Sequence, residues 1–234
     1  MKKLERLYEG KAKILWTTDS PEHMVQEFKD DATAFDGTKH AVVEGKGRFN
    51  NAISSRLFEM LRDEGIRTHF VRKLSEREML VERLKMLPVE VVVRNAAAGS
   101  IVKKLGATEG MRFDPPLVEF FLKNDALHDP LITDDHIRAF GLAPEGMPRE
   151  MRKRALQVND VLRRFLAGRG VDLVDFKLEF GLKGGELVLG DEVSPDTCRL
   201  RDAATGRIMD KDRFRQDLGG FMEAYGEVLD RVTQ

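Results

Sequence analysis

The chain has 234 residues, a length that suits one large or two small domains. Hydrophobic residues make up 41% and charged residues 34%, a composition typical of a folded rather than a disordered chain. With a formal net charge of −1, neither nucleic acid nor a membrane is expected as a partner, so local groups of lysine and arginine would have to hold any anionic substrate. One cysteine, Cys198, excludes an intrachain disulfide and a cysteine-rich metal site, and we expect a reduced thiol without a catalytic role.

The N-terminus and the apolar segments predict the compartment. Charges at Lys2, Lys3, Glu5 and Arg6 are not followed by an apolar segment, so no signal peptide is expected. No uninterrupted apolar segment approaches the length that crosses a membrane. We therefore expect a cytoplasmic protein.

The first half of the chain is predicted to be rich in strands. Residues 1–45 fit short strands and turns, with one helix near Glu22–Phe28. Apolar residues at helical spacing predict a helix from Gly47 to Glu64. A strand at 68–74 follows, and the capping box Ser75–Glu78 indicates a short helix after it.

A domain boundary is expected near Lys85–Pro88, between this β-rich half and a larger α/β half. Six elements are predicted in the second half: a buried strand at 89–94, a helix through Lys104, a long irregular loop at 106–132, an amphipathic helix at 148–166, a hairpin at 173–193, and a final helix from near Asp210. The helix at 148–166 would bury Met151, Ala155, Leu162 and Phe165. Long ordered loops are usually functional, so the loop at 106–132 is a candidate lid.

The run Leu173–Gly181 alternates apolar and charged residues in strict period two. In a strand, this alternation places Asp175, Lys177 and Glu179 on one face. On the other face it places Val174, Phe176, Leu178 and Phe180. A lysine between two carboxylates on one rigid face suggests that the protein uses the arrangement.

The second strand of the hairpin ends in two more acids, Asp191 and Glu192. A slip of one residue in register would exchange them on the acidic face. We expect paired residue numbers that sum to an even number, which places Asp191 beside Glu179. Carboxylates on paired strands suit Mg²⁺, which prefers oxygen ligands and often binds substrate phosphates as well. The hairpin therefore predicts a nucleotide-dependent enzyme.

Two further segments offer cations for phosphates. Lys11 and Lys13 share a strand face about 7 Å apart, and Gly10 would let the preceding turn approach a ligand. This is not a Walker A motif, and a solvated edge strand is the alternative interpretation. Arg94 ends a strand and Ser100 opens a helix, whose free N–H groups suit a phosphate. A capped helix with Arg94 paired to an acid remains equally open.

Two polar segments complete the candidate sites. Lys123–Asp129 contains aspartates and a histidine, but no second histidine lies at the spacing of zinc ligands. A loop that contacts ribose or amino groups of a substrate fits better, with Lys123 as a phosphate contact. Asp196 follows a turn signal and precedes Arg199, so the two could grip a polar substrate. An ordinary surface turn with salt bridges is the alternative.

Long motifs resemble a known family. Its two signatures are similar to Leu87–Ser100 and Leu173–Gly181. Further matching segments, in chain order, are Gly10–Lys13, Asp36–Gly37, Gly45–Gly47, Asn50–Asn51, Phe121–Pro130, Gly190–Asp196 and Met209–Arg215. Together they resemble phosphoribosylaminoimidazole-succinocarboxamide synthase, of purine biosynthesis, over nearly the whole chain. The resemblance implies an α+β fold of two lobes, with the nucleotide in the cleft between them. The lobes would be a small, kinase-like, antiparallel β-rich one at 1–85 and a larger ATP-grasp-like α/β one at 86–234.

The resemblance also implies the activity and the site residues. The enzyme would be an ATP-dependent ligase that uses Mg²⁺ to join L-aspartate to 5-aminoimidazole-4-carboxylate ribonucleotide through an acyl phosphate. A homodimer is implied as well. The implied catalytic residues are Lys177, Asp175 and Arg94, and the metal ligands are Glu179 and Asp191. The implied ATP contacts are Gly10, Lys11, Ala12, Lys13, Met86 and Lys123. The implied ribonucleotide contacts are Asp36, Arg94, Ser100, Asp129, Asp196 and Arg199.

Two other functions compete with this interpretation. A kinase-like phosphotransferase would use the same ATP site on a hydroxyl group, form ADP without releasing phosphate, and need no aspartate. A nucleotide sensor or RNA-binding module would need a basic stripe with exposed aromatic residues. Aromatic residues make up only 7% of the chain and mostly recur at core spacing, so the second alternative is disfavoured.

Overall fold

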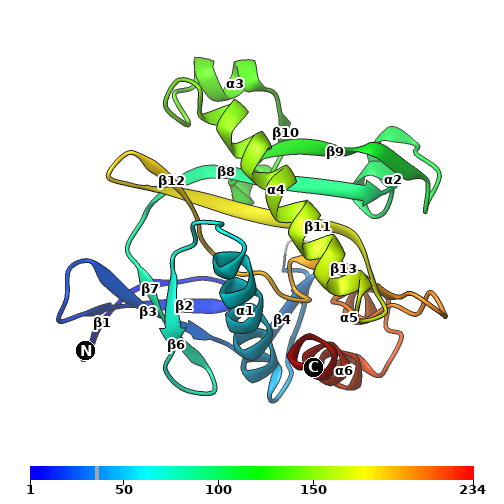
Figure 1. Ribbon diagram of the computed structural model, residues 1–234, viewed down its shortest axis with the longest axis horizontal. Coiled ribbons are helices and arrows are strands. Elements are labelled where there is room, and N and C mark those ends of the chain that lie inside the picture. The colour runs from blue at the N-terminus through cyan, green and yellow to red at the C-terminus, as the bar shows by residue number, and fades with distance from the viewer. Residues whose placement is uncertain (35–36) are drawn as a thin grey trace.

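The computed structural model describes residues 1–34 and 37–234, which form two antiparallel sheets with helices packed against them (Figure 1). The first sheet has the strand order β1-β2-β3-β7-β6. Its strands are β1 (Lys3–Glu9), β2 (Lys13–Thr18), β3 (His23–Phe28), β6 (Phe70–Lys73) and β7 (Glu78–Glu82). A hairpin of β4 (Asp31–Ala34) and β5 (Lys39–Val42) follows β3 in the chain.

The second sheet has the order β10-β9-β8-β11-β12, and β13 pairs with the N-terminal part of β11. Its strands are β8 (Lys85–Ala96), β9 (Arg112–Leu122), β10 (Leu131–Ile132), β11 (Val171–Lys183), β12 (Glu186–Leu189) and β13 (Cys198–Asp202). Strands β8 and β11 pair from Asp175 opposite Arg94 to Leu182 opposite Lys85. This pairing brings together the two segments that resemble family signatures. The fold class is α+β, as expected.

Helices cover both sheets. They are α1 (Lys46–Asp63), α2 (Ser100–Leu105), α3 (Asp134–Ala139), α4 (Met147–Ala167), α5 (Asp212–Arg215) and α6 (Phe221–Thr233), with a 3₁₀ turn at Asp125–Leu127. Helix α1 packs on the first sheet, and α4 lies across the second (Figure 1). The two long helices expected at 47–64 and 148–166 are confirmed. Of the expected α4 stripe, Phe165 is only half-buried, and Leu166 is buried in its place.

The expected boundary near Lys85–Pro88 falls at the start of β8, between the two sheets. The C-terminal helix α6 nevertheless returns to pack against α1 (Figure 1). The buried apolar core also includes residues from both sheets, such as Phe28 and Phe176. The division of the chain into domains 1–85 and 86–234 therefore stays a prediction.

The predictions of two short helices in the first half are wrong. Residues 23–28 form β3, which lies between β2 and β7 and bonds to both, whereas an isolated helix of this length is only marginally stable. The apparent capping box Ser75–Glu78 forms a turn between β6 and β7. There, the backbone N–H groups of Leu74 and Ser75 both donate to the Glu78 carbonyl. Tertiary strand pairing prevails over local helix signals in both places.

The prediction of one long irregular loop at 106–132 is also wrong. Its middle part, Arg112–Leu122, is β9, which pairs with β8 and buries Val118 and Phe120. A strand inside the second sheet cannot act as a lid. The final helix expected from Asp210 is split into α5 and α6, because Gly219 and Gly220 both adopt positive φ angles between them.

The alternation of the run 173–181 is interrupted near its start. The pairing of β11 with β13 shifts register between Leu173 and Asp175. Val174 consequently packs with Ala96 and Ala98 instead of joining the main core, where Phe176, Leu178 and Phe180 lie. Residues 175–180 keep the expected alternation. In the described part of the chain, no helix is long and apolar enough to span a bilayer.

Candidate active site

A cleft of about 960 Å³ opens between the two sheets. It is lined by every predicted site residue that the structure describes: Gly10, Lys11, Ala12, Lys13, Met86, Arg94, Ser100, Lys123, Asp129, Asp175, Lys177, Glu179, Asp191, Asp196 and Arg199. Asp36, the remaining predicted substrate contact, lies outside the described residues. The cleft thus collects residues from widely separated parts of the chain.

Lys177 projects from β11 into the cleft and is held between two acids. Its Nζ donates to Glu179 Oε1 at 2.7 Å and to Glu90 Oε1 at 2.7 Å. Burial opposes the charge on Lys177, but the carboxylates of Glu179 and Glu90 outweigh burial and raise its pKa well above the usual value. The side chain is therefore a fixed ammonium group. Glu90, on β8 directly opposite Glu179, is a partner that the sequence interpretation missed.

The register of the hairpin differs from the expected one. Phe180 pairs with Leu189, so the paired residue numbers sum to an odd number and the expected even sum is wrong. Strand β12 ends at Leu189, and Asp191 has a left-handed backbone with φ of 58°. The alternation rule ceases to apply where the strand ends, so both Asp191 and Glu192 line the cleft.

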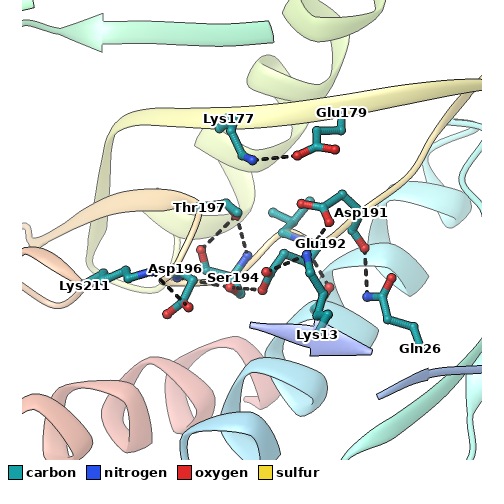
Figure 2. Close-up of polar contacts among 12 residues, drawn as sticks. Lys13, Gln26, Lys177, Glu179, Asp191, Glu192, Ser194, Asp196, Thr197 and Lys211 are labelled. Carbon is teal, nitrogen blue, oxygen red and sulfur yellow. Dashed lines mark hydrogen bonds and ion pairs between the residues drawn. The ribbon is translucent and has the colours of Figure 1, made fainter. Parts of the chain in front are cut away.

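Lys13, from β2 in the first sheet, joins these two acids across the cleft (Figure 2). Its Nζ donates to Asp191 Oδ1 and, at 2.8 Å, to Glu192 Oε1. Gln26 Nε2 donates to the Asp191 carbonyl oxygen at 3.1 Å, which supports the left-handed turn. Burial opposes ionisation of Asp191, but the charge of Lys13 outweighs it and holds the pKa of this carboxyl well below its usual range. Lys13 likewise has a raised pKa, because Asp191 and Glu192 outweigh its burial.

The predicted metal ligands are the buried Glu179 and the partly buried Asp191, whose carboxylates are close enough to affect each other's ionisation. Lysines now balance them: Lys123 and Lys177 bond to Glu179, and Lys13 bonds to Asp191. Among residues 1–34 and 37–234, no three histidine, cysteine or carboxylate side chains converge as a metal cage. Mg²⁺ is commonly bound by only one or two carboxylates together with substrate phosphates, so this oxygen pair fits it.

Arg94 lines the cleft and is almost fully buried. Its guanidinium donates to Glu119 at 2.6 Å, to Asp175 at 2.8 Å and to Ser100 Oγ at 2.8 Å. Pairing with acids, one of the two alternatives left open above, is therefore observed. Ser100 also opens α2 beside Arg94, so the phosphate interpretation keeps its geometric basis.

Arg199 extends this ionic cluster from β13. Its guanidinium donates to Asp175 at 2.8 Å and to Asp212 at 2.9 Å. Asp175 thus pairs with two arginines. Arg199 also lies against Gly99, where a Cβ atom would come within 2.3 Å of the guanidinium. Only glycine at position 99 permits this contact.

Asp196 is nearly buried and surrounded by donors. Tyr225 OH donates to its Oδ1 at 2.6 Å, while Lys46 Nζ lies 2.7 Å and Lys211 Nζ 3.5 Å from its Oδ2. Burial opposes ionisation of Asp196, but the charges of Lys211 and Lys46 outweigh it and lower its pKa. Asp196 is therefore an anion inside the protein and not part of an ordinary surface turn.

Away from the arginines, towards the start of β8, part of the cleft is apolar. Its apolar lining includes Leu15, Met24, Val81, Leu84 and Met86. Lys11 Nζ donates to Asp125 at 2.7 Å and so links the first sheet to the 3₁₀ turn of the second half. Asp129 Oδ1 accepts a bond from the Asn124 backbone N–H at 2.8 Å.

The structure adds lining residues that the sequence interpretation did not select. Besides Glu90 and Glu192, they include Lys211 and Arg215, both in the matching segment Met209–Arg215. The signal that could have found the two cations was their four-residue spacing, which aligns side chains on one helical face. Burial in the cleft lowers the pKa of Lys211.

An apolar end, a row of paired lysines and acids, and an arginine-rich end define a nucleotide-dependent enzyme acting on an anionic substrate. Comparisons with known proteins narrow this class. The SAICAR synthetase family model matches residues 6–232. Phosphoribosylaminoimidazole-succinocarboxamide synthase of Persephonella marina is 56% identical over 234 residues, covering 100% of this chain and 98% of the relative. The chain therefore belongs to the SAICAR synthetase family, which are ligases of purine biosynthesis.

Solved structures agree with this assignment. The crystal structure of phosphoribosylaminoimidazole-succinocarboxamide synthase from Ehrlichia chaffeensis matches with a TM-score of 0.95 and 44% identity, over 98% of each chain. A SAICAR synthetase in complex with ADP matches with a TM-score of 0.93 and 48% identity, over 97% of each chain. A SAICAR synthase from Saccharomyces cerevisiae, at 22% identity and a TM-score of 0.76, shares the fold.

Proposed function

We propose that this cleft performs both steps of the ligase reaction, with the residues of each step at different places along it. The observation that carries the proposal is the position of Lys177, fixed between Glu90 and Glu179 and near Asp191. A permanently charged donor in that place suits an oxygen-rich group that gains or shares negative charge during transfer.

The chemistry explains why such a donor is needed. The carboxylate of the ribonucleotide is a poor electrophile, so its oxygen first attacks the γ-phosphorus of ATP and ADP leaves. The amine of L-aspartate then attacks the carbonyl carbon of the acyl phosphate, and phosphate leaves. Both steps bring anions together, so charge neutralisation and positioning dominate. Mg²⁺ held by Glu179 and Asp191 would supply part of that neutralisation on the ATP phosphates.

The other residues are proposed to bind and orient the substrates. Gly10, Lys11, Ala12, Lys13 and Lys123 would contact the ATP phosphates, and the segment at Met86 would lie beside adenine. Arg94, Ser100 and Arg199 would hold the ribonucleotide's phosphate, with Asp36, Asp129 and Asp196 on its polar groups. Asp175 holds the two arginines in place. Lys211 and Arg215 would bind the carboxylates of L-aspartate.

The finer description of the protein follows the same reasoning. We propose that the first sheet forms a kinase-like lobe and the second an ATP-grasp-like lobe, with the nucleotide between them. Burial of anions among lysines from both sheets supports this placement. The chain is proposed to act in the cytoplasm as a homodimer, which light scattering of the purified protein would test.

The deciding experiment measures phosphate release with ATP, Mg²⁺, the carboxylate ribonucleotide and L-aspartate, omitting each in turn. The proposal expects full release only when all four are present. Release that does not require aspartate would contradict the two-step reaction. ADP formation without phosphate release would indicate the kinase-like phosphotransferase instead.

A further inference from the structure

Asp196 is held from outside the cleft by two residues that do not line it. Tyr225 on α6 donates to one carboxylate oxygen at 2.6 Å, and the ammonium of Lys46, the first residue of α1, lies 2.7 Å from the other. Both side chains are fully buried. Among the described residues that line the cleft, Asp196 and Lys211 are present, whereas Lys46 and Tyr225 are not.

Burying these charges costs stability, which suggests that the arrangement serves a function. A buried lysine–carboxylate pair is seldom more stable than apolar residues of the same volume, because both ions lose their hydration. Tyr225 needs only a neutral acceptor to satisfy its hydroxyl, yet it bonds to an anion, and burial together with Asp196 raises its pKa well above the usual value. The hydroxyl therefore remains a donor.

The donors fix the direction of the carboxylate. Each carboxylate oxygen carries two lone pairs, and the Tyr225 hydrogen bond on one oxygen together with the Lys46 ammonium against the other opposes rotation of the group. Lys211 stands on the cleft side, 3.5 Å from one oxygen (Figure 2). The remaining lone pairs are then available to hydroxyl or amine donors of a ligand in the cleft.

We propose that Lys46 and Tyr225 are positioning residues that hold Asp196 from behind and thereby set the affinity of the cleft for the ribonucleotide. This inference rests on the proposed contact between Asp196 and the ribonucleotide. It also gives α6 a role in substrate binding, because that helix packs against α1 and both supply a donor to one carboxylate.

Three variants test the inference: Tyr225→Phe, Lys46→Met and Asp196→Asn. Tyr225→Phe removes one hydroxyl and keeps the ring that packs on Phe221 at a centroid distance of 4.5 Å. The control is Thr233→Val on the same helix, whose hydroxyl bonds only to backbone carbonyls of its own helix. Phosphate release gives KM for the ribonucleotide and kcat, and calorimetry gives the affinity for ADP.

Hydrogen bonds to charged groups typically contribute enough for a tenfold change in a binding constant. We expect Tyr225→Phe and Lys46→Met each to raise KM for the ribonucleotide about tenfold or more, with ADP affinity within about twofold of wild type. Thr233→Val should match wild type.

Two outcomes would overturn the inference. In the first, Tyr225→Phe keeps the wild-type KM while Asp196→Asn raises it. In the second, Tyr225→Phe weakens ADP and ribonucleotide equally, as a purely structural role requires. If Asp196→Asn itself leaves KM unchanged, the proposed contact fails and the inference fails with it. Should Lys46→Met not fold, Tyr225→Phe alone decides.

Discussion

Most charged side chains of the cleft are paired with opposite charges, and most pairs join residues far apart in the chain. Lys13 bonds to Asp191 and Glu192, and Lys123 bonds to Glu179. Such buried pairs are weak evidence for stability, since desolvation offsets most of their attraction. They are better explained as preorganised partners for the charged groups of a ligand. On binding, the ligand would displace one residue of each pair.

Gly99 illustrates how a residue without a side chain shapes the site. Its φ of 64° and ψ of −121° are open only to glycine, and an added Cβ would come within 2.3 Å of Arg199. We expect Gly99→Ala to move Arg199 and raise KM for the ribonucleotide at least about tenfold. The control is Gly106→Ala at the other end of α2, with φ of 70° and open space around it. A wild-type KM in Gly99→Ala would contradict the role given to Arg199.

The element scale shows what local sequence patterns could and could not predict. Long helices and the strand at 175–180 were predictable, because each repeats one period over many residues. Strands β3 and β9 were not predictable, because hydrogen bonds to neighbouring strands stabilise them and no local pattern reveals those neighbours. The conformation of these segments depends on partners that are distant in the sequence.

The same distinction applies to the site. Lys177 and Glu179 were predictable from one alternating segment. Glu90 was not, because it becomes relevant only when β8 pairs with β11. Asp191 was selected correctly as a residue of the cleft but for the wrong reason, since its place follows from a left-handed turn and not from register.

Helix α1 is predicted to anchor the acidic segment that follows β12. Ser54 Oγ accepts the buried backbone N–H of Val193 at 3.1 Å. Ser54→Ala would leave that donor unsatisfied and lower the free energy of unfolding by about 1–3 kcal/mol. The matched control is Ser55→Ala, because the neighbouring buried Ser55 Oγ has no hydrogen-bond partner among the described residues. Urea denaturation measures both, and equal losses would contradict the anchor.

At the scale of the whole molecule, buried carboxylates link stability to pH. The pKa is lowered at Glu179, Asp191, Asp196 and Asp212, because nearby cations outweigh burial. Asp210 and Glu90 act in the opposite sense, since burial raises the pKa of Asp210 to about 6 and that of Glu90 above its usual value. Lowered groups bind protons more readily in the unfolded chain, so their stabilisation is complete above the unfolded pKa of about 4 and is lost at lower pH.

We therefore expect the free energy of unfolding to fall as the pH drops below about 5, where the four lowered groups outweigh Asp210 and Glu90. Urea midpoints measured between pH 7 and pH 3.5 would show the decline. In Asp191→Asn, the slope should be shallower, because one of the lowered groups is gone. A midpoint that stays constant down to pH 3.5 would contradict the charge state assigned to the cleft.

The central claim is that Glu179 and Asp191 make the phosphate end of the nucleotide site. Calorimetry of ADP binding, with and without Mg²⁺, on wild type and Asp191→Asn tests it most directly. We predict that Mg²⁺ strengthens ADP binding to wild type and that Asp191→Asn loses this gain. Its metal-free affinity should not fall, because one of the two carboxylates that bind Lys13 becomes neutral and repels the phosphates less. An undiminished Mg²⁺ effect in Asp191→Asn would contradict the claim.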